Sequence, residues 1–177
     1  FMKSRTGSRF LDRTTPPNIF TLILLAGVSA LSMNIFLPSL PSMAAYFETD
    51  YAVMQLSVAV YLAVNAVLQV LIGPISDKLG RRPVILGGMA IFLVATLGCI
   101  LAPNAALFLT FRMMQAAVVV AMVLSRAVVR DMVPADQAAS MIGYVTMGMT
   151  VVPMLGPVLG GALDQIFGWQ ASFWALF

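Results

Sequence analysis

Between two long apolar runs, the chain reads Gly73-Pro74-Ile75-Ser76-Asp77-Lys78-Leu79-Gly80-Arg81-Arg82-Pro83. Gly73 and Pro74 predict the end of the first helix, because proline removes a backbone donor and clashes with the preceding turn. Gly80 permits a tight reversal, and Pro83 suits the first turn of the next helix, where its missing N–H costs nothing. The stretch is therefore predicted to be a short charged loop that joins two apolar helices.

Runs without Asp, Glu, Lys or Arg continue on both sides of this loop, over residues 14–47, 51–76, 83–111, 113–125, 137–163 and 165–177. A helix crosses a bilayer with about 20 apolar residues. Ala102-Pro103-Asn104 is a turn signal, so the run around it is divided there. The sequence predicts an all-α polytopic membrane protein with a bundle over residues 19–177. Its five complete spans lie at about 19–37, 52–72, 84–101, 105–124 and 139–162, and a sixth begins near residue 171.

The composition excludes several classes of protein. Of 177 residues, 60% are hydrophobic and only 10% are charged, whereas soluble domains carry about 25% charged residues. Such a chain is neither a soluble enzyme nor disordered. With no His and one Cys, no metal site or disulfide framework is expected. Without a carboxylate inside any span or a Gly-x-Ser-x-Gly motif, an intramembrane enzyme is not expected either. The net charge of +3 does not favour a nucleic-acid partner.

The placement of the basic residues predicts the orientation in the membrane. Nine of the ten fall on one side of the predicted spans: Lys3, Arg5, Arg9, Arg13, Lys78, Arg81, Arg82, Arg126 and Arg130. The opposite loops hold Glu48, Asp50 and Asp164 and no basic residue. Basic loops stay in the cytoplasm, so residues 1–18 are predicted to be a cytoplasmic tail. A secretory signal peptide ending near Val28-Ser29-Ala30 is the alternative, although the apolar run continues past it.

The two ends of the chain predict a longer protein. Phe1 cannot initiate translation, and Phe177 lies only seven residues into an apolar segment that begins at Ala171. We expect the chain to be the N-terminal portion of a polytopic protein whose second six-helix half is absent from the sequence.

The loop at residues 73–83 resembles the signature loop of the major facilitator superfamily of secondary transporters. The positions that carry the resemblance are Gly73, Asp77, Gly80, Arg81, Arg82 and Pro83. At the cytoplasmic mouth, these charges and those of Arg126, Arg130 and Asp131 are expected to form a network. We hypothesise that the network holds one access state of the transporter closed.

Three further segments extend the resemblance over nearly the whole chain. Residues 34–41 look like the double-proline end of the first span in twelve-span drug exporters, and residues 109–115 resemble the intramembrane arginine motif. The fifth span resembles the antiporter motif at Gly143, Gly156, Pro157, Gly160 and Gly161. Together with residues 125–134 and the aromatic residues near the C-terminus, these segments are similar to the bicyclomycin- and chloramphenicol-resistance branch of drug:proton antiporters.

The resemblance implies a function as well as a fold. It implies the N-terminal helix bundle of a bacterial inner-membrane exporter that expels apolar or cationic drugs by antiport with protons, through alternating access. The proton gradient would then supply the energy, and no cofactor is expected. Two alternatives stay open: a carrier of a nutrient or metabolite, and a non-transporting membrane scaffold or truncated fragment.

Three positions depart from the pattern of the family. Ala116 and Val152 stand where glycines are expected, which affects close packing. Asn34 stands where this branch commonly has Asp, and an amide cannot carry a proton. Because no acid lies within the five predicted spans, the titrating group is expected outside this sequence or at Asp77 or Asp131.

Polar residues inside the spans are the candidates for a substrate path. A charge near mid-membrane costs at least about 2.5–3.5 kcal/mol, so Arg112 must have a partner or a wet cavity, and Gln115 lies one turn away. Arg112 either lines the central cavity or binds backbone carbonyls of broken helices. Asn65 and Gln69 share a face of the second span with Gln55, where they face a cavity or bind another helix. Tyr61 is a further candidate that packing alone also explains.

Overall fold

The computed structural model describes residues 18–177, and in that part of the chain every regular element is a helix. Five segments are long and apolar enough to cross a membrane: Ile19–Tyr46, Tyr51–Leu79, Arg81–Leu101, Ala105–Asp131 and Ala135–Phe167. The prediction of an all-α polytopic bundle with five spans is confirmed. The predicted tail at residues 1–18 lies outside the described residues except for Asn18, whose side chain caps the first helix by accepting from Phe20 N at 2.9 Å.

The first span is broken into three pieces by its two prolines. It consists of α1 (Ile19–Asn34), a 3-10 turn η1 (Leu37–Ser39) and α2 (Leu40–Tyr46). Pro38 and Pro41 each lie in the first turn of the piece that follows, where a residue without an N–H is tolerated. As a result, carbonyls in the last turn of α1 lose intrahelical partners, although that of Leu31 still accepts from Ile35 N at 2.9 Å.

The second span is longer than predicted. We expected Gly73 and Pro74 to end it, but this prediction is wrong, because α3 (Tyr51–Leu79) continues through both residues. Pro74 removes only one backbone hydrogen bond, and in an apolar setting the helix keeps all the others. The reversal occurs at Gly80 alone, with φ +90°, a conformation that glycine adopts without strain. Pro83 lies in the first turn of α4 (Arg81–Leu101), as expected.

The fourth and fifth spans also extend beyond their predicted limits. The fourth is α5 (Ala105–Gln115), a 3-10 turn η2 (Ala116–Val118) and α6 (Val119–Met132). The fifth is α7 (Ala135–Phe167), which is continuous through Pro153 and Pro157 and, at 1.5 Å per residue, is about 50 Å long. After a turn at Gly168, the short helix α8 (Gln170–Trp174) begins where the sixth span was expected.

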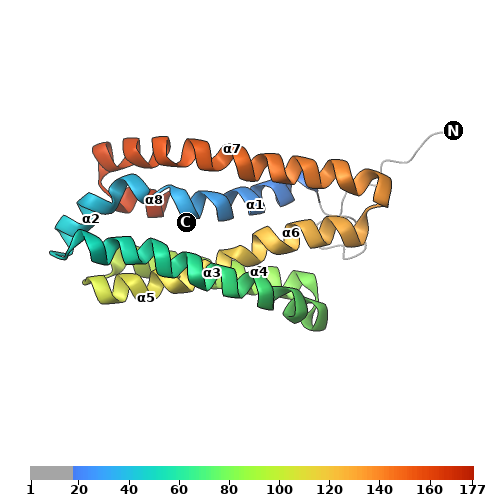
Figure 1. Ribbon diagram of the computed structural model, residues 1–177, viewed down its shortest axis with the longest axis horizontal. Coiled ribbons are helices and arrows are strands. Elements are labelled where there is room, and N and C mark those ends of the chain that lie inside the picture. The colour runs from blue at the N-terminus through green and yellow to red at the C-terminus, as the bar shows by residue number, and fades with distance from the viewer. Residues whose placement is uncertain (1–17) are drawn as a thin grey trace.

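The helices lie along one common direction (Figure 1). α1 packs on α7 and α6, α4 packs on α5, and α3 packs on α6 and α4. A cluster of aromatic rings closes the end of the bundle where α2 and α8 lie. There, the rings of Phe108, Trp169 and Phe173 stand 5.7–5.9 Å apart and nearly perpendicular to one another.

Glycines let α1 and α7 approach closely. A Cβ built on Gly160 would overlap the carbonyl oxygen of Ile35 and lie 2.7 Å from its carbonyl carbon, and one on Gly148 would lie 2.9 Å from the side chain of Ile23. A Cβ on Gly156 would be 3.4 Å from Asn34, and one on Gly161 would be 3.7 Å from Pro38. Helix packing therefore explains Gly160 and Gly148, whereas a Cβ on Gly156 or Gly161 would make only ordinary contacts.

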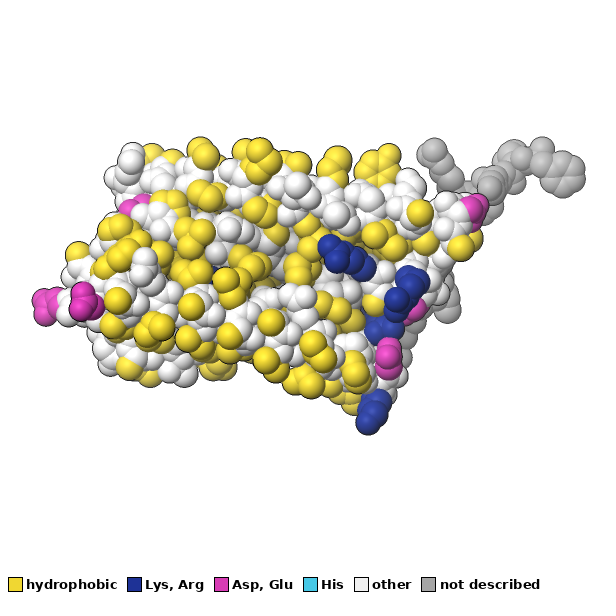
Figure 2. Space-filling model, in the orientation of Figure 1, with side chains coloured by type: hydrophobic (Ala, Val, Ile, Leu, Met, Phe, Trp, Pro, Cys, Tyr) yellow, Lys and Arg dark blue, Asp and Glu magenta, His cyan; other side chains and the backbone are white. Residues whose placement is uncertain are grey.

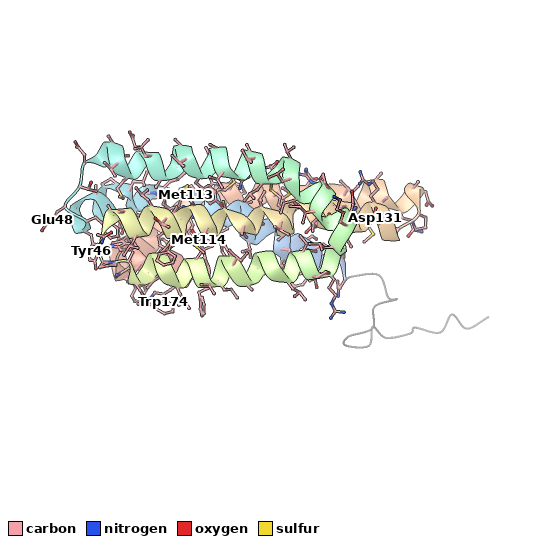
Figure 3. The ribbon with its side chains drawn as sticks, turned by 90° about the horizontal axis from the view of Figure 1, so that it is seen from below. Tyr46, Glu48, Met113, Met114, Asp131 and Trp174 are labelled. Carbon is pink, nitrogen blue, oxygen red and sulfur yellow. The ribbon has the colours of Figure 1, made fainter. Side chains whose placement is uncertain are left out.

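Charged residues divide between the two ends of the bundle, as Figure 2 shows. We call the end with Lys78, Arg81, Arg82, Arg126 and Arg130 the basic end, and the end with Glu48, Asp50 and Asp164 the acidic end. Figure 3 shows Glu48 and Asp131 at opposite ends, with Met113 and Met114 between them. The predicted separation of basic from acidic loops therefore has a physical counterpart in the fold.

Candidate functional site

Arg112 lies inside the bundle as the eighth residue of α5, and its side chain is fully buried. One guanidinium nitrogen donates to Oε1 of Gln115, and the other terminal nitrogen donates to the carbonyl oxygen of Ser32 at 2.9 Å. Ser32 lies in the last turn of α1, which ends before the residue whose N–H would otherwise bind this carbonyl. The break in the first span thus provides the acceptor for the buried cation.

Two aromatic rings enclose the same guanidinium group. Its central carbon lies 4.0 Å from the centroid of Phe36 and 4.1 Å from that of Tyr61. Cations over aromatic faces within about 6 Å are attracted by the ring quadrupole, more strongly where water is absent. Arg112 is therefore stabilised by two rings, a carbonyl and an amide, without a carboxylate.

Gln115 extends the network to a third helix. Its side-chain nitrogen donates to Oγ1 of Thr96 at 2.8 Å, and that hydroxyl donates to the carbonyl of Phe92 at 2.7 Å. Gln115 and Thr96 are fully buried. The network connects α1, α4 and α5, with Tyr61 of α3 against it, so four of the five spans meet at Arg112.

The structure brings together only some of the residues that were predicted to line a substrate path. Arg112, Gln115 and Tyr61 are in one cluster, which we call the Arg112 cluster and which includes Ser32, Phe36 and Thr96. Asn34 instead donates to the carbonyl of Ala30 in its own helix at 2.9 Å. Gln69 donates to Oδ1 of Asn65 at 2.7 Å, with Asn65 buried and Gln69 exposed.

Sequence reasoning missed three members of the Arg112 cluster. Ser32 contributes a backbone carbonyl, which no side-chain pattern reveals. Phe36 and Thr96 are common residue types in apolar spans, and they lie 76 and 16 positions from Arg112 in the chain. The only signal was the pair of prolines that breaks the first span near Ser32.

At the basic end, Arg81 is the centre of a second cluster. It forms ion pairs with Asp77 at 2.8 Å and with Asp131 at 3.0 Å, and it donates to the hydroxyl of Ser76. These contacts join the end of α3, the start of α4 and the end of α6. We call Ser76, Asp77, Arg81 and Asp131 the Arg81 cluster.

The other predicted members of the charge network stand apart from these carboxylates. Arg82 is exposed, and in the described part of the chain it has no ion pair. Arg126 donates to the sulfur of Met149 on α7 at 3.2 Å. Arg126 and Arg130 line a cavity of about 280 Å³ together with Gly73, Asp77 and Arg81.

Gly143 is the first glycine of the antiporter-like set on α7. A Cβ built on it would have no neighbouring atom within 4 Å.

No group of three or more metal-ligating side chains occurs within residues 18–177.

Comparison with known proteins identifies a family of helical membrane proteins, in agreement with the helical bundle described above. Residues 22–177 match the Major Facilitator Superfamily, so the chain belongs to that family and is a multi-pass membrane protein. It is 37% identical over 158 residues to a chloramphenicol resistance protein of Pseudomonas aeruginosa. The matched region covers 86% of this chain and 38% of that protein. It is 33% identical over 156 residues to multidrug resistance protein D of Escherichia coli K12, where the match covers 88% of this chain and 40% of the relative. Multidrug resistance protein MdtL of Escherichia coli O9:H4 is 32% identical over 160 residues, covering 89% and 40%.

The family predicted from the loop at residues 73–83 is thus confirmed, and these relatives are drug-resistance proteins, in agreement with the branch that the motifs indicated. The chain spans about two fifths of the length of these curated relatives.

Proposed function

We propose that the chain is half of the translocation pathway of a secondary active transporter that exports small apolar or cationic drugs. The observation that carries this proposal is the match to the Major Facilitator Superfamily together with relatives that are drug-resistance proteins at 32–37% identity. In the complete protein, a second six-helix half would close the pathway, and the two halves would rock about a central site.

Within this half, the Arg112 cluster acts as a hub that fixes the broken first span against three other spans. Arg112 is fully buried within this half, so its direct role is to position α1, α3, α4 and α5. Nε of Arg112 and the hydroxyl of Tyr61 are buried, with no hydrogen-bond partner among the described residues. These two groups are available to water or substrate when the cluster opens.

The Arg81 cluster is suited to bias alternating access. An ion-pair network changes a two-state equilibrium only by the difference between its pairing in the two states. Asp77 and Asp131 come from different helices and share one arginine, so a small displacement of α6 from α3 would break one pair. We assign this cluster the role of a latch at the cytoplasmic mouth.

The proposal includes coupling to the proton gradient without a cofactor. The carrier of the proton is not Asn34, because an amide does not titrate. Asp77 and Asp131 are the candidate carriers within this chain, and a carboxylate in the other half is the alternative. The protein is placed in the bacterial inner membrane with its N-terminus and its basic end in the cytoplasm, as the distribution of basic residues favours.

A transport assay with the complete gene tests the proposal. Cells that lack their own exporters are loaded with chloramphenicol or a fluorescent cationic dye, and accumulation is followed with and without a proton uncoupler. We expect lower accumulation in expressing cells and loss of the difference after uncoupling. Efflux that is insensitive to the uncoupler would contradict antiport, and equal accumulation with and without expression would contradict drug export.

A further inference from the structure

The cavity at the basic end has a charged lining that the Arg81 cluster does not neutralise. It is bordered by α3, the start of α4, α6 and α7, and its volume is about 280 Å³. Its charged lining residues are Asp77, Arg81, Arg126 and Arg130. With Asp131, which is bonded to Arg81 from outside the lining, the group holds three guanidinium groups and two carboxylates. It therefore carries one positive charge in excess.

The excess charge lies on Arg126 and Arg130. Both carboxylates are in contact with Arg81, and in the described part of the chain neither of the other two arginines has a carboxylate within 4 Å. Arg126 and Arg130 are one turn apart on α6, so their side chains are neighbours, and like charges at this spacing repel. The nearest polar contact of Arg126 is a thioether sulfur, which is a weak acceptor. An anion between these arginines would satisfy both.

The rest of the lining is apolar. Val123, Leu124 and Ala127 of α6 and Ile142 of α7 are buried or half-buried, whereas Arg126 and Arg130 are exposed. A ligand in this cavity therefore meets guanidinium groups together with hydrocarbon. This combination fits an amphiphile with an anionic head better than a free ion.

We propose that this cavity binds the phosphate group of an anionic phospholipid headgroup, with Arg126 and Arg130 as its donors. A guanidinium group binds phosphate oxygens in a bidentate manner, and one phosphodiester carries the single negative charge that balances the excess. Basic pockets between membrane helices on the cytoplasmic side are suited to such headgroups. Bound there, the lipid links α6 to α7 beside the Arg81 cluster. This inference concerns lipid binding and does not depend on drug transport.

The test measures lipid binding to the complete, purified and delipidated protein. Phosphatidylglycerol, phosphatidylethanolamine and inorganic phosphate are titrated separately, bound lipid is counted by native mass spectrometry, and thermal unfolding is recorded in parallel. The variants are Arg126→Gln, Arg130→Gln and the double variant. Lys78→Gln is the matched control, because it removes one positive charge from the same end but does not line the cavity.

We expect tighter binding of phosphatidylglycerol than of phosphatidylethanolamine. Each arginine contributes about fivefold to the affinity, so the double variant should lose about 25-fold, whereas Lys78→Gln should bind as the wild type does. If the double variant does not purify, each single variant is still expected to lose about fivefold.

Four results would overturn the proposal. The first is equal affinity for the two lipids, and the second is unchanged phosphatidylglycerol affinity in the arginine variants. The third is stabilisation by inorganic phosphate at the same concentrations as by lipid, because the ligand would then be a free anion. Destabilisation of the double variant without any lipid binding to the wild type would also refute it. That result would mean that a carboxylate elsewhere in the protein pairs with these arginines.

Discussion

A buried guanidinium group without a carboxylate partner is the most demanding residue-level feature of this bundle. Arg112 replaces the water it has lost with a helix-end carbonyl, an amide oxygen and two ring faces. Each contact depends on the planar, forked shape of the guanidinium group. An ammonium is a point charge on a flexible stem and cannot use all four at once.

We therefore expect Arg112→Lys to damage the protein although it conserves the charge. The variant loses the fork that reaches two acceptors at once and most of the ring contacts. An inadequately paired buried charge destabilises by about 3–5 kcal/mol. Thermal unfolding of the purified protein and drug accumulation in cells should both report this loss. Met113→Leu, at the neighbouring half-buried position, is the control and should behave as the wild type. An Arg112→Lys protein of unchanged stability and activity would show that the cluster is not a hub.

How far the sequence predicts this site depends on the kind of contact. Arg112 and Gln115 were identifiable because polar side chains are rare in apolar spans and the two are one turn apart. The hydrogen-bond acceptor at Ser32 could not be identified from the sequence, because it is a backbone carbonyl whose availability depends on where α1 ends. Tyr61 was a candidate for which packing was the more common explanation, and its distance to Arg112 is what places it in the cluster.

At the scale of the helices, two kinds of contact determine how they pack: close approach at glycines and ion pairs at helix ends. α1 and α7 touch through glycines, and the ends of α3, α4 and α6 meet at Arg81. Charge-free runs predicted that these helices exist but gave their ends too short. Helices continue into the charged interface region, since backbone hydrogen bonds are favourable there too. Two turns are exceptions: α4 ends at Leu101 and α5 begins at Ala105, as the turn signal at residues 102–104 predicted. At Gly80, a positive φ ends the helix, and the sequence predicted a reversal there.

Gly160→Ala should separate α1 from α7. The added methyl group would overlap the carbonyl oxygen of Ile35, which is backbone and cannot move aside. Overpacking of this kind costs about 1–3 kcal/mol or more, so we expect a lower unfolding temperature and a lower yield of folded protein. Gly143→Ala is the matched control on the same helix, because its Cβ would meet nothing within 4 Å. Alanine is the better helix former, so this variant should be neutral or slightly stabilised. Equal behaviour of the two variants would contradict the packing at Gly160.

Asp77→Asn and Asp131→Asn should alter transport much more than stability. Both carboxylates are exposed to solvent, Asp77 more than Asp131, and exposed ion pairs contribute only about 0.2–1 kcal/mol. Expression should therefore be intact, while drug efflux falls because the latch no longer favours one access state. Since both residues act through Arg81, the double variant should be no worse than the more severe single variant. Additive losses would mean that the two carboxylates act separately, and unchanged efflux would refute the latch.

For the whole molecule, the distribution of charge decides how the bundle sits in a membrane. The described basic residues other than Arg112 lie at one end, and three acids lie at the other. Long apolar faces connect the two ends: α7 exposes Met147, Met154 and Val158, and α3 exposes Val67 and Val70. These faces are suited to lipid or to a second helical half. The sequence predicted this charge distribution, because successive loops of a helical bundle lie at alternate ends and the charges of each loop can be counted directly.

The proposed orientation predicts which end of the bundle is accessible from outside the cell. Cys99, the one cysteine of this sequence, is fully buried and contributes little background. Any cysteine in the rest of the complete protein is first replaced by serine. In intact cells, a membrane-impermeant maleimide should label Glu48→Cys at the acidic end. It should label Lys78→Cys at the basic end only after the membrane is permeabilised, because basic loops are retained in the cytoplasm. Both positions are exposed, so a difference between them reports sidedness rather than burial. Labelling of Lys78→Cys in intact cells, with protection of Glu48→Cys, would reverse the orientation. The Arg81 cluster would then face the outside, which would contradict its proposed role as a latch at the cytoplasmic mouth.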